Sequence, residues 1–531
     1  MKPPHHNNLT LTKNPVNSVV GFSSNRIIPI LFGLFVLGAV LRTLDMGQPI
    51  GVDNLLSWRE TDIGGIARNF YREGMNLFYP RIDWRGDGPG YVEMEFPLYP
   101  WLIAVIYKLF GYHEIFGRLL SYSFSLGAMA VFFLLARYLL PPVGAVLASL
   151  FFVLSPLAIK ISNSLQPEGL MFLCYVLAAY AFIRWLDDNS WKHYGLALLA
   201  TTLCILAKAP AAHIGLFFAL IVLKEKGLVA LRQIRLWAFA IVALLPSILW
   251  YKHAHNFWLT YGNSLGVSNE THVAGLKLFT NPSLIRGIFH IELFHVWMPT
   301  GLIIGAIAIL VARSEKAAIY SLYWLLAILA FYLVIAYTTS ARWAIYYHIF
   351  SVPPVALLIG LGVEALIAVN WGKNLTRNWL PQMNTIVVVL VIVCLSGTFV
   401  FQGLQIYRST AQGAKDMEKL YQCAQEFKPA IPDNVLIATT APATVDKGRP
   451  IASNVPYMFY WLDRKGFNLF AENQSLQGII DLSKRGARYF IAEKGYFKRK
   501  RDFESDLRRT FPVIRECQPA VIFELTPKLK K

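Results

Sequence analysis

Long apolar stretches separated by short polar turns dominate this sequence between residues 27 and 401. A helix that crosses a bilayer needs about 20 mostly apolar residues, and several of these stretches reach that length. The composition agrees, because 55% of the residues are hydrophobic, only 15% are charged and the mean hydropathy is +0.44. Soluble proteins carry roughly 25% charged residues. The chain is therefore predicted to be an α-helical polytopic membrane protein.

Apolar segments of this kind predict about 11 transmembrane helices within a membrane domain that covers residues 27–405. The expected spans are 27–44, 119–140, 143–159, 170–185, 194–206, 214–223, 236–251, 296–311, 319–337, 345–369 and 386–401. Residues 95–111 are also apolar, but they are short and contain two prolines. That stretch is expected to be a re-entrant or interfacial helix.

Basic residues indicate the orientation, since Lys and Arg gather in cytoplasmic loops. If the basic N-terminal tail 1–26 is cytoplasmic, every second turn between the predicted spans also lies inside. These turns carry basic residues such as Arg137, Arg184, Lys224, Arg313, Lys373 and Arg377. The region after the last span then lies outside. The net charge of +18 fits this distribution and anionic lipid headgroups, so no nucleic-acid partner is expected.

Residues 408–531 have an ordinary globular composition and are predicted to form a small extracytoplasmic α/β domain. Predicted strands cover 435–440, 488–493 and 520–525, and predicted helices cover 415–427 and 475–486. Cys423 and Cys517 either form one disulfide in an oxidising compartment or remain free thiols. The other cysteines are expected to be small core residues, and no zinc-binding pattern is present: Cys174, Cys204 and Cys394.

The first external loop, residues 45–118, contains the densest group of acids in the first 400 residues, between positions 58 and 95. Charges of both signs make this loop too polar to lie in lipid. Helical spacing of Ile63, Ile66 and Phe70 argues against disorder. We expect a folded cap on the outer face, with carboxylates at the boundary between water and lipid.

Two pairs of acids in the cap are candidate site residues. Glu60 and Asp62 can serve as a general base or hold a cation. Alternatively, they pair with Arg59 and cap the helix that follows. Glu93 and Glu95 point to the same side of an extended segment and either face a site or form a solvated patch.

Other candidates lie at the expected outer ends of the membrane helices. Glu168 opens an apolar helix, where it either serves a site or simply complements the helix dipole. Lys208 and Arg342 also fall at outer boundaries. Arg342 is followed by three residues that either help it to hold a phosphate or belong to an interfacial aromatic belt: Tyr346, Tyr347 and His348.

Four segments of this chain resemble motifs of one membrane enzyme family. They are WRETDIGGIARNFYREG (58–74), EFPLYPWL (95–102), SLQPEGLM (164–171) and ARWAIYYHIFSVPP (341–354). Together with the large acidic first loop, they are similar to the C-superfamily integral membrane glycosyltransferases. The bacterial branch related to the protein O-mannosyltransferases (dolichyl-phosphate-mannose-protein mannosyltransferase-like) and to the lipid A aminoarabinose transferase is the most similar.

This resemblance implies a reaction and a place. Such enzymes move a sugar, with inversion, from a polyprenyl-phosphate donor to a hydroxyl of a lipid, glycan or protein acceptor on the outer face of the membrane. A carboxylate of the first loop acts as the base. The expected partners are therefore this donor, the acceptor and membrane lipids, and the expected location is a bacterial inner or plasma membrane.

The resemblance also suggests roles for single residues. Relatives have an Asp–Glu pair where this chain has Arg59 and Glu60, so Asp62 is the implied base and Glu60 an orienting group or a replacement. Glu95 stands where the aminoarabinose transferase has a lysine, so it is expected to contact the sugar or the acceptor. The residues expected to bind the substrates are Arg59, Glu93, Glu95, Glu168, Lys208, Arg342, Tyr346, Tyr347 and His348.

Metal dependence and function leave alternatives open. Some members of the superfamily use a divalent cation, and Glu60, Asp62 and Glu168 are able to supply oxygen ligands, but their spacing does not require one. The alternative function is a transporter or flippase of a lipid-linked sugar, although transporters usually show internal repeats and charges at the midplane. A structural or assembly protein is a third possibility that the charged cap disfavours.

Overall fold

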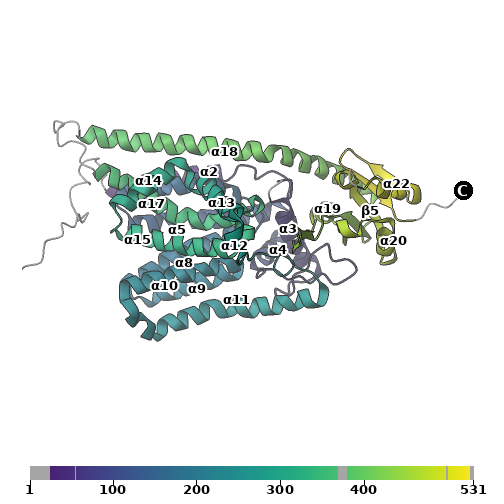
Figure 1. Cartoon of the computed structure of the whole chain (residues 1–531), viewed down its shortest axis with the longest axis horizontal. Coiled ribbons are helices and arrows are strands. Elements are labelled where there is room, and N and C mark those ends of the chain that lie inside the picture. The colour runs from purple at the N-terminus through teal and green to yellow at the C-terminus, as the bar shows by residue number, and fades with distance from the viewer. Residues whose placement is uncertain (1–23, 54–55, 369–379, 498–499, 527–531) are drawn as a thin grey trace, which may run out of the picture.

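The computed structural model describes residues 24–53, 56–368, 380–497 and 500–526. They form a bundle of long helices, a polar cap at one end of the bundle and a small domain with a β-sheet beyond the cap (Figure 1). The predicted tail 1–26, apart from its last three residues, lies outside the described residues, as does the turn with Lys373 and Arg377. The predicted polytopic helical class is confirmed.

Within the described ranges, seven helical stretches are long and apolar enough to cross a membrane, or eight with the bent pair α6 and α7. They comprise α5 (Ile115–Leu139), α8 (Glu168–Asp188), α11 (Ile234–Tyr261), α13 with α14 (Pro282–Ile291 and Met298–Val311), α15 (Lys316–Val334), η4 with α17 (Arg342–Ser351 and Val352–Ala368) and the membrane part of α18 (Leu380–Phe427). The prediction of about 11 exceeds this count.

The difference comes from three predicted spans that are helical but short. The described apolar part of α2 (Ser24–Leu41) begins at residue 27, α9 (Trp191–Ala207) has 17 residues and α10 (Ile214–Lys226) has 13. A further predicted span is broken. Pro156 has no N–H to continue α6 (Pro142–Leu154), so α7 (Pro156–Ser162) leaves at 55°.

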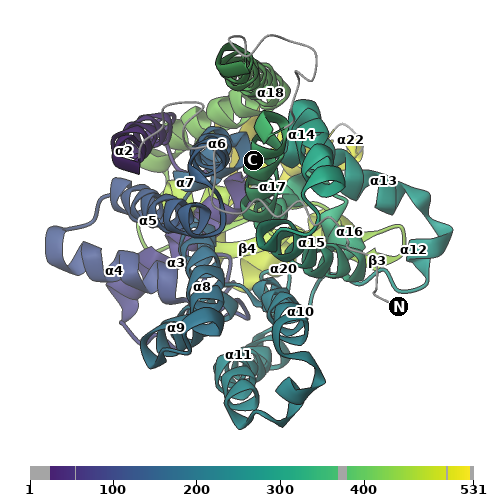
Figure 2. The ribbon, with the colours of Figure 1, turned by 90° about the vertical axis from the view of Figure 1, so that its left-hand side faces the viewer.

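Helix α17 lies in the middle of the bundle and is almost wholly buried (Figure 2). Its glycines let neighbouring backbones approach closely. A Cβ at Gly360 would overlap the carbonyl oxygen of Gly144 on α6, and one at Gly362 would overlap that of Ile304 on α14. Small residues at such crossings are typical of helix packing in membranes. The packing of α17 therefore fixes the relative positions of α6 and α14.

The cap contains two helices, α3 (Ser57–Glu73) and α4 (Leu98–Phe110). Between them the chain turns back on itself, with Arg81 and Tyr91 paired as an antiparallel bridge. We call residues 81–91 the cap hairpin. Helix α4 occupies the predicted re-entrant segment and has 13 residues. In Figure 1 both helices lie between the bundle and the C-terminal domain.

Helix α18 is continuous over 48 residues, from Leu380 to Phe427. The predicted span at 386–401 and the predicted helix at 415–427 are both helical, and both belong to this one helix. At 1.5 Å per residue the helix is about 72 Å long, roughly twice the thickness of a bilayer core. It runs along one side of the bundle and ends in the C-terminal domain (Figure 1).

The C-terminal domain is built on a five-stranded sheet of order β4-β1-β5-β7-β6. The strands are β1 (Leu436–Thr440), β4 (Lys465–Leu469), β5 (Ala487–Glu493), β6 (Val513–Glu516) and β7 (Ala520–Glu524). β4, β1 and β5 are parallel, whereas β7 and β6 are antiparallel. The three predicted strands are β1, β5 and β7. Strand β4, which begins Lys-Gly although three of its five residues are buried, and β6, which is exposed throughout, were not predicted from the sequence.

Cys423 and Cys517 form a disulfide, with Cα atoms 6.1 Å apart. The bond joins the end of α18 to the turn between β6 and β7, so the helix is covalently attached to the sheet at a second point. Cys174 and Cys204 are buried, as predicted. Cys394 is exposed on α18, so the expectation of a core position was wrong for that residue.

A Gly360→Ala substitution is expected to lower the thermal stability of the detergent-solubilised protein by several degrees. The added methyl group collides with backbone at the contact between α17 and α6, and neither helix can retreat without opening the bundle. Gly215→Ala on α10 is the matched control, because nothing lies within 4 Å of its Cβ position. Equal melting temperatures for the two variants, measured by fluorescence-detected size exclusion, would contradict this account of the packing.

Candidate active site

Helix α3 is buried over most of its length although many of its side chains are polar. Two adjacent glycines make this possible. A Cβ on Gly64 would lie 2.8 Å from the ring of Tyr460, and one on Gly65 would lie 2.8 Å from Asp83. The C-terminal domain and the cap hairpin can therefore both pack directly on the backbone of α3. Its first turns, with Arg59, Glu60 and Asp62, lie beneath this cover.

Four charged residues meet next to α3, and we call them the charged cluster: Arg59, Glu95, Glu168 and Lys208. Arg59 is paired with Glu95, and its Nη2 lies 3.8 Å from Oε1 of Glu168. Lys208 is paired with the same oxygen of Glu168. All four side chains are at most 8% exposed. The cluster thus joins α3, the segment before α4, the start of α8 and the turn after α9.

Two aromatic rings complete the cluster. The Nζ of Lys208 lies 4.4 Å from the ring centre of Tyr346 and 4.9 Å from that of Tyr347. A buried cation gains from such rings because their faces carry partial negative charge. Two cations and two carboxylates also balance in sign, which a site withdrawn from water requires. The structure therefore brings together six of the predicted substrate-binding residues: Arg59, Glu95, Glu168, Lys208, Tyr346 and Tyr347.

Asp62 lies close to the charged cluster and has one oxygen engaged. The indole Nε1 of Trp84 donates to its Oδ1 at 2.8 Å, while Oδ2 is buried without a hydrogen-bond partner among the described residues. Burial raises the pKa of Asp62 to about 7, although the Trp84 hydrogen bond and the charge of Arg59 oppose this. A carboxyl group with such a pKa can accept a proton near neutral pH.

Three further buried polar atoms in this region have no hydrogen-bond partner in the described part of the chain. They are Nε of Arg59, Oε2 of Glu168 and Oε1 of Gln166. Buried polar atoms are normally paired, and unpaired ones at one place point to a missing partner such as a ligand or water. With Oδ2 of Asp62, they offer one donor and three acceptors. This composition suits a hydroxyl-rich substrate.

Glu60 is not part of this group. Its Oε1 accepts from the backbone N–H of Leu165 at 3.0 Å and lies 3.3 Å from Nη1 of Arg118. Its Oε2 accepts from the N–H of Gly51 at 3.1 Å. Both oxygens are thus engaged in joining α3 to the loop before α8 and to α5. This geometry fits a structural carboxylate and leaves no free oxygen for the alternative role as a base.

Glu93 also lies apart from the charged cluster. Its oxygens accept from Ser264 Oγ at 2.6 Å and from Ser268 Oγ at 2.8 Å, and one contacts Nδ1 of His255 at 2.9 Å. These contacts fasten the cap to the loop that follows α11. Although Glu93 and Glu95 lie two residues apart, they serve different neighbours.

His348 and Arg342 do not join the tyrosines that lie between them in sequence. The His348 ring is fully buried, with Nδ1 2.7 Å from Glu292 and Nε2 2.8 Å from the carbonyl oxygen of Thr339. Arg342 is exposed at the start of η4. In this irregular segment only Tyr346 and Tyr347 reach the charged cluster.

Glu60, Asp62 and Glu168, the candidate ligands of a divalent cation, do not form a metal-binding group. Glu60 pairs with Arg118, and Glu168 pairs with Lys208, so each acid already has a cation. Within the described ranges no group of three or more His, Cys, Asp or Glu side chains is arranged for a metal ion. These three residues therefore do not fit a metal-binding set of oxygen ligands, and we assign no step to a metal.

An apolar pocket lies among α8, α9, α10 and α11. Its volume is about 240 Å³, and its lining includes Phe182, Ile205, Ala212, Phe218 and Ala243. Ile205 and Ala212 flank Lys208 in sequence, so one end of the pocket lies near that cation. In Figure 2, α10 and α11 form the rim of the bundle at this place.

Several residues that build the site carried no signal in the sequence. Arg118 lies in an apolar helix, and its pairing with Glu60 follows only from the tertiary fold. Trp84 was not among the predicted site residues. The tight Asp-Trp-Arg sequence at 83–85, with a charge on each side of the ring, was the one local hint that this side chain is held in place.

Comparison with known proteins supports the resemblance. Residues 89–251 match the family described as dolichyl-phosphate-mannose-protein mannosyltransferase. No curated protein matches the sequence. The fold is similar to ArnT from Cupriavidus metallidurans bound to undecaprenyl phosphate, with a TM-score of 0.59, 13% identity, and 94% of this chain and 98% of that chain covered.

A second similar fold is the oligosaccharyltransferase from Archaeoglobus fulgidus tethered to an acceptor peptide. Its TM-score is 0.56 at 12% identity, with 95% of this chain and 74% of that chain covered. The oligosaccharyltransferase AglB from Archaeoglobus fulgidus, in complex with an inhibitory peptide and a dolichol-phosphate, gives a TM-score of 0.54 at 13% identity, with 92% of this chain and 72% of that chain covered. At such identities these structures show a shared fold. With the family match, they confirm the predicted resemblance and the predicted enzyme class, a glycosyltransferase.

A Glu60→Gln substitution is expected to lower the melting temperature of the protein substantially. It removes the charge that balances buried Arg118, and an unpaired buried cation typically costs several kcal/mol. Asp187→Asn is the control, because Asp187 pairs with Lys316 at an exposed position, where ion pairs contribute little. If the Glu60 variant were as stable as the wild type but inactive, Glu60 would have a chemical role instead.

Proposed function

We propose that this chain, a membrane glycosyltransferase with an ArnT-like fold, transfers a sugar from a polyprenyl-phosphate donor to an acceptor hydroxyl with inversion. The observation that carries the proposal is the position of Asp62. Its unpaired, buried Oδ2 lies beside a cluster that holds two cations. One site therefore offers a proton acceptor for the incoming hydroxyl and positive charge for the departing phosphate.

In the proposed reaction, the acceptor oxygen attacks the anomeric carbon and loses its proton to Oδ2 of Asp62. The bond between that carbon and the phosphate oxygen breaks, and polyprenyl phosphate leaves as an anion. A single displacement of this kind inverts the anomeric configuration. A hydroxyl is a poor nucleophile, so removal of its proton by a positioned base contributes to the rate.

Arg59 and Lys208 are the proposed phosphate-binding residues. Burial by itself disfavours the charge of Arg59, but the carboxylates of Glu95 and Glu168 raise its pKa above the ordinary value. Both cations are fixed before the donor arrives, so little reorganisation is needed when negative charge develops on the leaving phosphate. Glu95 and Glu168 hold them in position and, through the unpaired Oε2 of Glu168, can accept a hydrogen bond from the sugar.

The apolar pocket beside Lys208 suits the polyprenyl chain. A tail in this pocket remains among apolar side chains of the bundle, while its phosphate reaches the charged cluster at the end of α9. ArnT, whose structure contains undecaprenyl phosphate, and AglB, whose structure contains dolichol-phosphate, share the fold at low identity. They support a lipid phosphate of this class as the donor carrier.

The orientation and the helix count belong to the same proposal. The basic turns at one end of the bundle favour a cytoplasmic N-terminus, with the cap and the C-terminal domain outside. In that orientation α2, α9 and α10 complete the set of about 11 membrane helices, although each is shorter than a full span. The acceptor, whether lipid, glycan or protein, then approaches from the external side of the membrane.

Asp62→Asn is expected to reduce transfer from a polyprenyl-phosphate sugar at least about 100-fold while donor binding is retained. Asparagine keeps the size and the Trp84 contact but cannot accept the proton. The measurement is release of radiolabelled sugar from the lipid by purified enzyme with membrane extract as acceptor. Asp433→Asn is the control, because that carboxylate is 87% exposed in the C-terminal domain. Normal transfer by the Asp62 variant would exclude it as the base.

The pH dependence provides a second test. Asp62 must be deprotonated to act as a base, so kcat/KM is expected to fall as pH decreases through about 7, the pKa of the buried carboxyl. Stability should change in the opposite sense. The pKa of Asp62 is higher in the folded protein than in the unfolded chain, so the native state binds the proton more tightly. The free energy of unfolding therefore decreases as pH rises from about 4 to about 7. Asp62→Asn should remove that dependence.

A further inference from the structure

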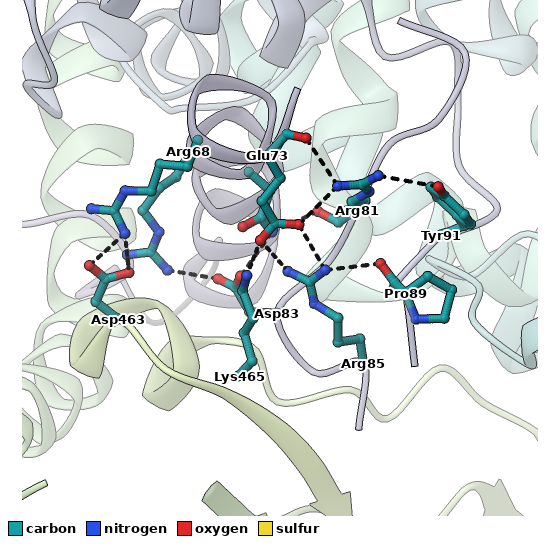
Figure 3. A network of polar contacts seen from close by, with 11 residues as sticks. Arg68, Glu73, Arg81, Asp83, Arg85, Pro89, Tyr91, Asp463 and Lys465 are labelled. Atoms are coloured by element: carbon teal, nitrogen blue, oxygen red, sulfur yellow. Dashed lines mark hydrogen bonds and ion pairs between the residues drawn. The ribbon is translucent and has the colours of Figure 1, made fainter. Parts of the chain in front are cut away.

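The cap hairpin is held between α3 and the C-terminal domain by a partly buried network of polar contacts (Figure 3). On the α3 side, Arg68 donates to Oδ2 of Asp83 at 2.7 Å, and Asn69 donates to Oδ1 at 2.8 Å. Both oxygens of this hairpin carboxylate are therefore engaged by one face of α3.

The C-terminal domain reaches the same arginine from the other side. Nη1 of Arg68 donates to the carbonyl oxygen of Tyr460 at 2.9 Å and lies 3.1 Å from Oδ1 of Asp463. The domain also fixes the hairpin backbone. Gly466 donates to the carbonyl oxygen of Asp83 at 3.1 Å and accepts from the N–H of Gly86 at 2.6 Å.

Trp84 lies between the residues that these contacts hold. Its ring is 8% exposed, and its Nε1 donates to Oδ1 of Asp62. The backbone of Asp83 is hydrogen-bonded to the C-terminal domain. Its side chain is linked to the same domain through Arg68. Residue 85 is anchored through Glu73, which Lys465 of the domain also contacts. The residues before and after Trp84 in the sequence are therefore both anchored, and this fixes the position of the indole.

We infer that the C-terminal domain holds Trp84 against Asp62 and so acts as a positioning element for the catalytic carboxylate. The inference rests on the proposed function, in which Asp62 is the base. Trp84 occupies Oδ1 and thereby directs Oδ2 toward the acceptor. Asp463 and Gly466 are positioning residues that act through Arg68 and the hairpin. The domain is accordingly part of the catalytic unit, although its residues that contact Arg68 lie more than 390 positions away in sequence.

The alternative is that Trp84 only fills space under the hairpin. The two readings differ in what they predict for the proton affinity of Asp62. This carboxyl also faces Arg59 on its own helix, Asp83 on the hairpin and Glu95 on the segment before α4. Those charges remain when the indole is changed. Loss of the Trp84 hydrogen bond therefore removes one contact that stabilises the charged form of Asp62, and its effect appears as a shift in the pKa of that carboxyl group.

The test compares Trp84→Phe and Asp463→Asn with the wild type and with Asp433→Asn. Phenylalanine preserves an aromatic side chain but cannot donate the hydrogen bond. We expect kcat to fall about tenfold and the acidic limb of the pH–rate profile to move to higher pH, because the charged carboxylate loses a partner. Asp463→Asn should produce a smaller shift in the same direction with the hairpin sequence intact. The Asp433 variant should leave the profile in place.

Two outcomes separate this inference from the proposed function. If the wild type transfers sugar and both variants lose rate without a shift of the acidic limb, the positioning role is overturned while the function stands. If the wild type transfers nothing from any polyprenyl-phosphate donor, the function fails, and infrared titration of the Asp62 carboxyl, assigned with Asp62→Asn, decides the inference. A higher pKa in Trp84→Phe would support positioning, and an unchanged pKa would overturn it.

Discussion

The arrangement of the site depends on removing four charges from water together. Arg59, Glu95, Glu168 and Lys208 come from four separate segments, and each would be costly to bury alone. Only the assembled bundle and cap bring two cations and two carboxylates within reach of one another. The same requirement explains why the cluster is useful. Charges that are already desolvated and fixed interact strongly with a reacting group, because no water competes with them.

Much of the site could be predicted from the sequence because polar residues at the ends of apolar segments are conspicuous. Glu168 and Lys208 stood out in this way, and both belong to the charged cluster. It was harder to predict which of two neighbouring acids belongs to the site. Glu60 and Asp62 are two residues apart, yet one is saturated by Arg118 and two backbone N–H groups, whereas the other keeps a free oxygen. Spacing cannot distinguish them, since their partners are set by how α3 rests on α5 and α8.

The fold shows a similar division between local and long-range information. Apolar length and charge bias predicted the membrane class and the sequence positions of the helices, and strand patterns predicted β1, β5 and β7. The continuity of α18 was missed because apolar and polar halves of one helix look like two elements. The contacts between the cap and the C-terminal domain could not be predicted from the sequence either. Nothing near Arg68 indicates that its partners include Tyr460 and Asp463, because tertiary packing alone brings them together.

Because α18 is one continuous helix, a tilt of its membrane part also moves the C-terminal domain at its other end. A tilt of about 5° at the membrane end moves the far end of a helix about 72 Å long by about 6 Å. Membrane helices adjust to bilayer thickness by tilting. The disulfide between Cys423 and Cys517 leaves little slack between the helix and the sheet. The thickness of the surrounding membrane is thereby mechanically linked to the fit of the domain on the cap.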